Sequence, residues 1–177
     1  MTDSSTAYLV GVAIPTLREL RSAVLTASSP DDAVIALREA GFAGGDAVYA
    51  AYERWLAESG ITDPTEGRSD SGELTIGEFG RATSRFFRDA GWGDVTFSTN
   101  EDEGVAVVEI ANCWEGSASS VASGCHITTG LLAAFFGRIA GYPVAVLETD
   151  CCGGEGTSCR FLMGNSEVMQ YQWEQLQ

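Results

Sequence analysis

Lysine is absent from this chain, and all ten of its basic residues are arginine. Without a lysine amine, the protein cannot form a Schiff base with a substrate, and it cannot build a Walker-type phosphate site. Histidine is almost absent as well, and the one copy, His126, directly follows a cysteine that is a candidate metal ligand. No credible Ser-His-Asp set can be assembled, so we assign no catalytic residue.

Basic charge is scarce overall, because 25 acidic residues face 10 basic ones and give a net charge of −15. Such a field repels the phosphates of nucleic acids and the head groups of anionic lipids. We therefore exclude nucleic acid and membrane surfaces as partners, and we interpret the acidity as a source of solubility.

Long apolar runs are also missing. Arg138 interrupts the longest candidate before it reaches the roughly 18 residues that a membrane span needs. The N-terminus has no basic leader, so we expect a cytoplasmic protein. A length of 177 residues with 45% hydrophobic composition fits one domain, residues 1–177, with a proper core.

The first half of the chain, residues 1–91, carries apolar residues at helical spacing. Glycine and proline divide it into four expected helices, and residues 61–73 between the third and the fourth are expected to be an exposed loop. The helices are expected after Pro15, from 28–31 to a stop at Gly41, from 44–46 to Gly60, and from Ile76 to Ala90.

The second half, residues 92–177, changes to strand periodicity. Alternating residues at 95–98 and 105–110 flank an acidic turn and predict an antiparallel hairpin, and a second hairpin is expected from 143–150 and 158–164. Between the hairpins, residues 125–141 are apolar nearly all round, as in a buried helix. A last helix is expected after Asn165 or Ser166. The expected fold is α+β, with N-terminal helices packed on a twisted antiparallel sheet of about four strands and one buried central helix.

Four of the five cysteines lie between residues 125 and 159. Cys125 starts the buried helix, where the helix dipole favours a thiolate, and Cys151 and Cys159 lie at the mouth of the second hairpin beside Glu148. Three thiolates and a carboxylate form a tetrahedral set that suits zinc. Spacing alone leaves two alternatives open: a disulfide between Cys151 and Cys159, or five cysteines that act as small buried hydrophobic residues.

The same segment resembles the 4-vinyl reductase domain family over about residues 105–164. The residues that carry the resemblance are Asn112-Cys113-Trp114-Glu115, Cys125 with Gly130, Pro143-Val144, Glu148-x-x-Cys151 and Gly156-x-x-Cys159-x-Phe161. The family is similar in fold to subunits of the TRAPP vesicle-tethering complex and includes the sensor domains of phenol-responsive transcriptional activators. In those sensors three cysteines and a glutamate bind a structural zinc, and the resemblance places these ligands on Cys125, Glu148, Cys151 and Cys159.

Two departures from those sensors concern the ligand. They hold the phenol hydroxyl with a tryptophan, where this chain has Ile110, and with a histidine on an earlier element, whereas the histidine here is His126. Phenol is therefore not the expected effector. We expect His126 to be bonded to backbone at the helix start, and Cys152 to point away from the ligands. An apolar pocket between the buried helix and the sheet is expected to include Ile110, Trp114, Thr129, Phe135 and Val146.

These features predict a free-standing sensor or carrier domain, not an enzyme, with a structural zinc and a pocket for a small apolar or aromatic molecule. A first alternative is a tetrapyrrole vinyl reductase, or an accessory protein of (bacterio)chlorophyll synthesis, although the chain has no G-x-G-x-x-G fingerprint. A second alternative is a scaffold that dimerises through its first helices. We expect a homodimer.

Overall fold

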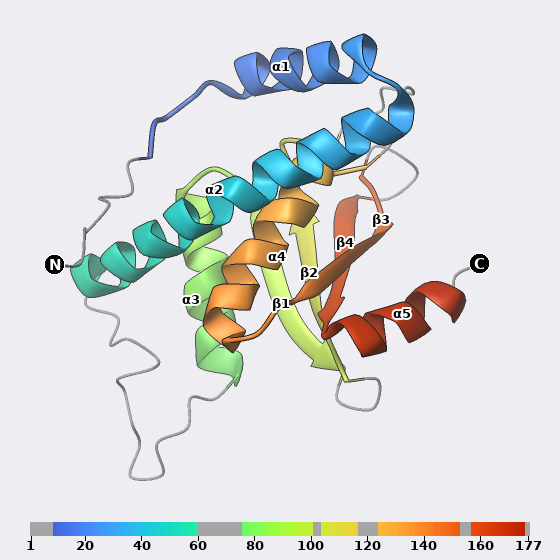
Figure 1. The fold of residues 1–177 in the computed structure, drawn as a ribbon. Helices are drawn as coiled ribbons and strands as arrows, with labels where there is room; N and C mark the ends of the chain where they lie inside the picture. Colours follow the sequence, from blue (N-terminus) through green and yellow to red (C-terminus); the bar gives the residue numbers. More distant parts are fainter. Residues whose placement is uncertain (1–8, 60–75, 101–103, 117–123, 153–156, 176–177) are drawn as a thin grey trace, which may run out of the picture.

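The computed structural model describes residues 9–59, 76–100, 104–116, 124–152 and 157–175 (Figure 1). The predicted loop at 61–73 and most of the segment 116–124 lie outside these residues. The described elements are α1 (Ile14–Ala27), α2 (Pro30–Ser59), α3 (Ile76–Asp89), β1 (Asp94–Asn100), β2 (Val105–Ala111), α4 (His126–Ala140), β3 (Ala145–Asp150), β4 (Ser158–Gly164) and α5 (Ser166–Gln175). They confirm the predicted α+β class. None of the described helices combines the length and the apolar character that a membrane crossing requires.

The sheet has the order β1-β2-β4-β3, and every neighbouring pair is antiparallel. Both predicted hairpins are therefore confirmed, and the pairing of β2 with β4 joins them. In that central pair Ile110 lies opposite Cys159. The register brings the end of β2, and the residues that follow it, beside the mouth of the second hairpin.

Both faces of the two central strands are buried. On one face Val108, Ile110 and Phe161 belong to the main core under α4, and on the other Val107 and Leu162 belong to a smaller cluster with Met169 of α5. This alternation follows from the two-residue period of a strand. It places Cys159, two residues before Phe161, on the α4 side of the sheet.

α4 is the buried central helix that the sequence predicted, and α2 lies across it (Figure 1). The crossing is close because glycines stand at the contact. A Cβ added at Gly41 would lie 2.0 Å from the carbonyl oxygen of Ile127, and one added at Gly130 would lie 2.0 Å from that of Arg38. The two backbones can approach to this distance only without these side chains.

The predicted break between the second and third helices is wrong, because α2 runs without interruption from Pro30 to Ser59. The sequence interpretation took Gly41 as a stop and residues 44–46 as a new start. In the structure Gly41 and Gly45 are buried where α2 meets α4. The packing outweighs the cost of a glycine inside a helix, which is about 1 kcal/mol relative to alanine.

Aromatic rings fill the space between the helices and the sheet. Phe135 of α4 makes edge-to-face contacts with Tyr52 of α2 and with Phe87 of α3, and Phe136 stacks on Phe97 of β1. These rings belong to one main core cluster. Offset and edge-to-face geometry adds stability beyond the area that the rings bury.

α1 lies at the edge of the molecule, beyond α2 (Figure 1). Arg21 is its one buried residue. Arg21 donates a hydrogen bond of 2.8 Å to the carbonyl of Gly124, and Arg18 donates one of 2.9 Å to the carbonyl of Trp114. The helix is thus tied by arginines to the two chain segments that lead into α4.

Candidate metal centre

The four predicted metal ligands converge at one place. The donor atoms of Cys125, Glu148, Cys151 and Cys159 all lie within 4.8 Å of one another. Cys125 is the N-cap of α4, Glu148 lies in β3, Cys151 follows β3, and Cys159 lies in β4. The structure therefore brings together residues that could hold a metal ion, from a helix start and both strands of the second hairpin.

The sulfur atoms have a spacing that suits a tetrahedral ion. The Sγ of Cys125 lies 3.9 Å from that of Cys151 and 3.3 Å from that of Cys159. Two sulfurs that each bind a tetrahedral zinc at about 2.3 Å lie about 3.8 Å apart. Both sulfur pairs lie within about 0.5 Å of that separation.

Only one of the two carboxylate oxygens of Glu148 accepts a hydrogen bond from the described residues. Its Oε2 accepts a hydrogen bond of 2.6 Å from the backbone N–H of Cys125. Its Oε1 is buried and accepts no hydrogen bond from the described residues. Burial raises the pKa of Glu148. A cation at Oε1 would satisfy this oxygen and keep the carboxylate ionised, so the donor set fits a metal ion.

The thiols alone cannot all ionise. Hydrogen bonds from the thiols of Cys125 and Cys159 lower the pKa of Cys113 to about 3, whereas the same bonds with Cys113 raise the pKa of Cys125 and that of Cys159. A divalent cation supplies the charge that further thiolates would need.

All five cysteines meet in this cluster, which the sequence interpretation missed. The Sγ of Cys113 lies 3.8 Å from that of Cys125, and the Sγ of Cys152 lies 3.1 Å from that of Cys159. The expectation that Cys152 points away is wrong, because the turn after β3 brings its backbone N–H to 3.3 Å from the Cys159 sulfur. No disulfide joins any of the five.

A buried carboxylate holds the start of α4 beside the cluster. The two oxygens of Glu115 accept hydrogen bonds of 2.9 Å from the N–H of Ile127 and 2.8 Å from that of Thr128. Arg21 Nε lies 3.3 Å from Glu115 Oε1. Glu115 therefore satisfies two orphan N–H groups of the helix end and places a negative charge at its positive pole. The Asn-Cys-Trp-Glu sequence contained this residue without indicating that role.

Within the described part of the chain His126 has no backbone partner, which differs from the expectation. Its side chain is buried, and neither ring nitrogen has a hydrogen-bond partner among the described residues. Burial lowers its pKa to about 4, so the ring is neutral at pH 7. The nearby N–H groups of α4 are already taken by Glu115 and Glu148.

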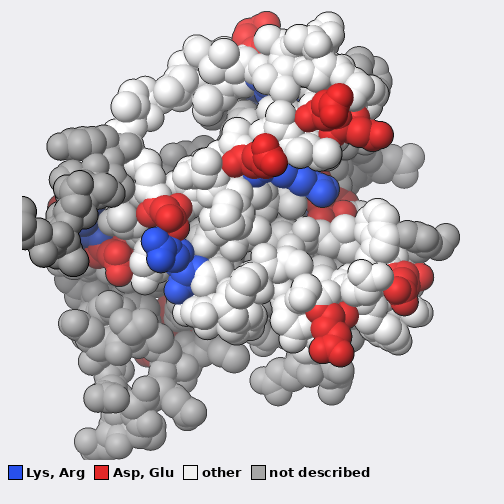
Figure 2. Space-filling model, in the orientation of Figure 1, with Lys and Arg blue, Asp and Glu red and all other residues white. Residues whose placement is uncertain are grey.

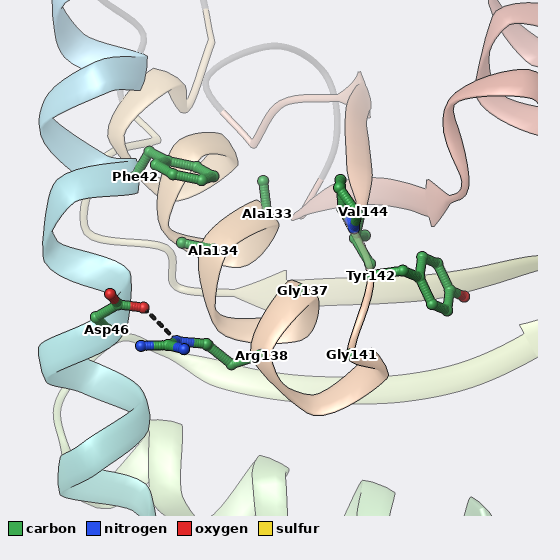
Figure 3. A pocket seen from close by; sticks show the side chains of 10 residues that line it. Phe42, Asp46, Ala133, Ala134, Gly137, Arg138, Gly141, Tyr142 and Val144 are labelled. Carbon is green, nitrogen blue, oxygen red and sulfur yellow. Dashed lines mark hydrogen bonds and ion pairs between the residues drawn. The ribbon is translucent and has the colours of Figure 1, made fainter.

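The residues predicted to line a pocket are mostly core residues. Ile110, Trp114 and Phe135 are buried, and Val146 packs against the main core. The hydroxyl of Thr129 donates a hydrogen bond of 2.8 Å to the carbonyl of Cys125. None of the five lines the open hollow of about 500 Å³ between α2 and the end of α4 (Figure 3). That hollow is lined by Phe42, Asp46, Ala133, Ala134, Gly137, Arg138, Gly141, Tyr142, Pro143 and Val144.

The surface has the acidic character that the composition predicts. Figure 2 shows acidic side chains at several separate places on one face, and no broad basic patch is visible on its described part. Beside the hollow, Arg138 Nε lies 2.6 Å from Asp46 Oδ1. An arginine that is paired in this way is a weak site for an anion.

No known family profile matches the sequence, and no curated protein matches it. Among solved structures, the fold matches the phenol-responsive sensory domain of the transcription activator PoxR with phenol, at a TM-score of 0.62 and 18% identity, over 96% of this chain and 84% of that chain. A vinyl-4-reductase family protein from Methanocaldococcus jannaschii aligns at a TM-score of 0.47 and 13% identity, over 88% and 82% of the two chains. The chain therefore has the fold of the phenol-responsive sensory domain of PoxR, one of the folds that the resemblance implied.

Proposed function

We propose that this protein is a small-molecule sensor or carrier domain with a structural zinc ion bound by Cys125, Glu148, Cys151 and Cys159. The observation that carries the proposal is the convergence of these four donor atoms within 4.8 Å. Four protein ligands complete a tetrahedral shell and leave no open position for a substrate, which is typical of structural zinc and not of catalytic zinc.

The ion would fasten the start of α4 to the open end of the second hairpin. Cys125 and Cys159 are 34 residues apart in the chain, and their sulfurs already lie 3.3 Å apart. Zinc bound there would fix the position of α4 over the sheet. A ligand bound beside α4 would then contact a helix whose position is fixed.

The ligand is proposed to be a small aromatic molecule with one polar substituent, which would bind between α4 and the sheet by displacing rings that pack there. Two buried polar atoms support this choice, because Thr83 Oγ1 and Trp114 Nε1 have no hydrogen-bond partner among the described residues. Leaving such a group unpaired costs about 1–3 kcal/mol, which a ligand hydroxyl or carbonyl would recover. The phenol named for the PoxR domain is a molecule of this class.

Thermal shift measurements with single-ring aromatic compounds test the ligand. We expect a hydroxyl- or carbonyl-bearing ring to raise the unfolding temperature. Trp114→Phe removes the N–H donor and keeps an aromatic ring, so it should reduce that shift. Trp92→Phe is the matched control. The ring centroids of Trp92 and Trp114 lie 5.9 Å apart, but the Trp92 nitrogen is not among the buried unpaired atoms of the described residues. Equal shifts in both variants, or no shift with any compound, would refute the proposed ligand class.

A homodimeric scaffold is the second candidate, and one observation favours it. Seven large apolar side chains within residues 9–42 are exposed: Leu9, Val10, Val12, Ile14, Leu20, Ile35 and Phe42. Val10 is 81% exposed and Leu20 59%. Exposed apolar groups gathered near α1 are typical of an interface. Light scattering should give twice the chain mass, and Leu20→Asp should halve it, whereas a monomeric wild type would eliminate this candidate.

A further inference from the structure

Cys113 lies beside the four-residue set and its sulfur contacts one of the four donors. It is only 3% exposed, and its Sγ lies 3.8 Å from that of Cys125. That separation equals the edge of about 3.8 Å expected for two sulfurs on a tetrahedral zinc. The Cys125–Cys151 pair, at 3.9 Å, has the same spacing.

The backbone before Cys113 turns sharply. Asn112 has φ of 57°, in the left-handed region that few non-glycine residues adopt. Its side chain donates a hydrogen bond of 3.3 Å to Asp94 Oδ2. Asparagine tolerates this conformation better than most residues do. The turn at the end of β2 directs Cys113 toward the thiol cluster.

The segment after Cys113 is fixed against α4 and the cluster. Glu115, two residues on, accepts hydrogen bonds from the N–H groups of Ile127 and Thr128. The next residue, Gly116, passes close to the thiols, because a Cβ added there would lie 3.1 Å from the Sγ of Cys159. The backbone on both sides of Cys113 is therefore held beside the cluster.

Glu148 can keep its hydrogen bond to the start of α4 if it dissociates from the ion. Its Oε2 already accepts the Cys125 N–H at 2.6 Å, at the positive end of α4. The carboxylate can therefore give up the contact of Oε1 with the ion and stay bound to the helix. Zinc accepts thiolate as readily as carboxylate in such sites.

We infer that Cys113 is a fifth ligand of this centre, which takes the coordination position of Glu148 and gives a four-thiolate site with Cys125, Cys151 and Cys159. In the exchange one zinc–oxygen bond would break and one zinc–sulfur bond would form, so that the Cys113 thiolate would replace the Glu148 carboxylate with no change of charge. No oxidation is involved. This inference depends on the proposed zinc site, whose regulation it describes.

Zinc content and X-ray absorption of three variants test the inference. Glu148→Gln keeps an acceptor for the Cys125 N–H but is a poor ligand. It should retain one zinc per chain, with four sulfurs at about 2.3 Å. Adding Cys113→Ser to this variant should lower zinc affinity at least tenfold. Adding Cys152→Ser instead is the matched control, since Cys152 also contacts the cluster, and it should leave the affinity unchanged.

The outcomes separate the two proposals. If the wild type holds zinc and Glu148→Gln loses it to the same extent with or without Cys113, the fifth ligand is refuted and the proposed site stands. A wild type without zinc refutes both. A cadmium titration needs no Glu148 variant, because cadmium prefers thiolates and should recruit all four. Removing one of the four in Cys113→Ser should lower the thiolate-to-cadmium absorption by about a quarter. The absorption should stay unchanged in Cys152→Ser. Unchanged absorption in Cys113→Ser would also overturn the inference.

Discussion

At the scale of single residues, Glu115 joins three parts of the chain. Its carboxylate accepts three hydrogen bonds from the first turn of α4 and faces Arg21 of α1. Its side chain has no exposed surface. A buried charge of this kind is stable only while its partners remain, so loss of the carboxylate charge should leave the buried Arg21 without this ion pair.

Glu115→Gln should therefore lower the free energy of unfolding by about 2–4 kcal/mol. The amide also turns an N–H₂ group toward N–H donors of the helix. Urea denaturation of zinc-saturated protein measures the effect. Glu109→Gln is the control, because Glu109 pairs with Arg160 at 3.5 Å and is 49% exposed, and it should change stability by less than about 0.5 kcal/mol. Similar losses in both variants would contradict the role given to Glu115.

The sequence predicted that four residues of the candidate site converge but missed two neighbours, for a physical reason. Cys125, Glu148, Cys151 and Cys159 could be placed because helix starts and hairpin ends fix where the backbone runs. Cys152 and Cys113 lie in turns, where side-chain direction depends on local φ and ψ that spacing does not reveal. The φ of 57° at Asn112 is such a case.

At the scale of elements, the crossing of α2 and α4 positions Cys125, the candidate metal ligand at the start of α4. Gly45 is buried at this crossing, and a Cβ added to it would lie 2.2 Å from the Cβ of Ala134. A Cβ added to the adjacent Gly44 would meet nothing within 4 Å. Two neighbouring glycines of one helix thus stand in opposite environments.

Gly45→Ala should destabilise the protein by about 1–3 kcal/mol, because the helices must separate to admit the methyl group. Gly44→Ala should stabilise it by up to about 1 kcal/mol through helix propensity alone. Chemical denaturation of the pair provides the comparison. Stabilisation by both substitutions would show that the helices do not pack as closely as described.

Glycines also explain why a break was wrongly predicted within α2, with a stop at Gly41 and a new start at 44–46. A glycine in a sequence is equally consistent with a helix end and with a close helix crossing, and only the partner helix distinguishes them. Strand alternation, by contrast, was sufficient for the first hairpin, and two apolar runs around a glycine-rich turn were sufficient for the second. The strand order β1-β2-β4-β3 required long-range information.

At the scale of the whole molecule, zinc would connect the start of α4 to the second hairpin. A ligand present at about 1,000 times its dissociation constant adds about 4 kcal/mol to stability. In a chain of this size, chelation of zinc should then lower the unfolding temperature by roughly 10 °C. After chelation, amide hydrogen exchange should increase at the start of α4, at the last residues of β3 and at the first residues of β4, while β1 stays protected. A uniform increase over the sheet would contradict a local role for the ion.

The most direct test of the central claim is the zinc content of protein purified without added metal. We predict about one zinc per chain in the wild type, and in Cys159→Ser a loss of bound zinc together with lower stability. Substoichiometric zinc in the wild type, or unchanged stability after Cys159→Ser, would contradict the claim that these four residues form a structural zinc site.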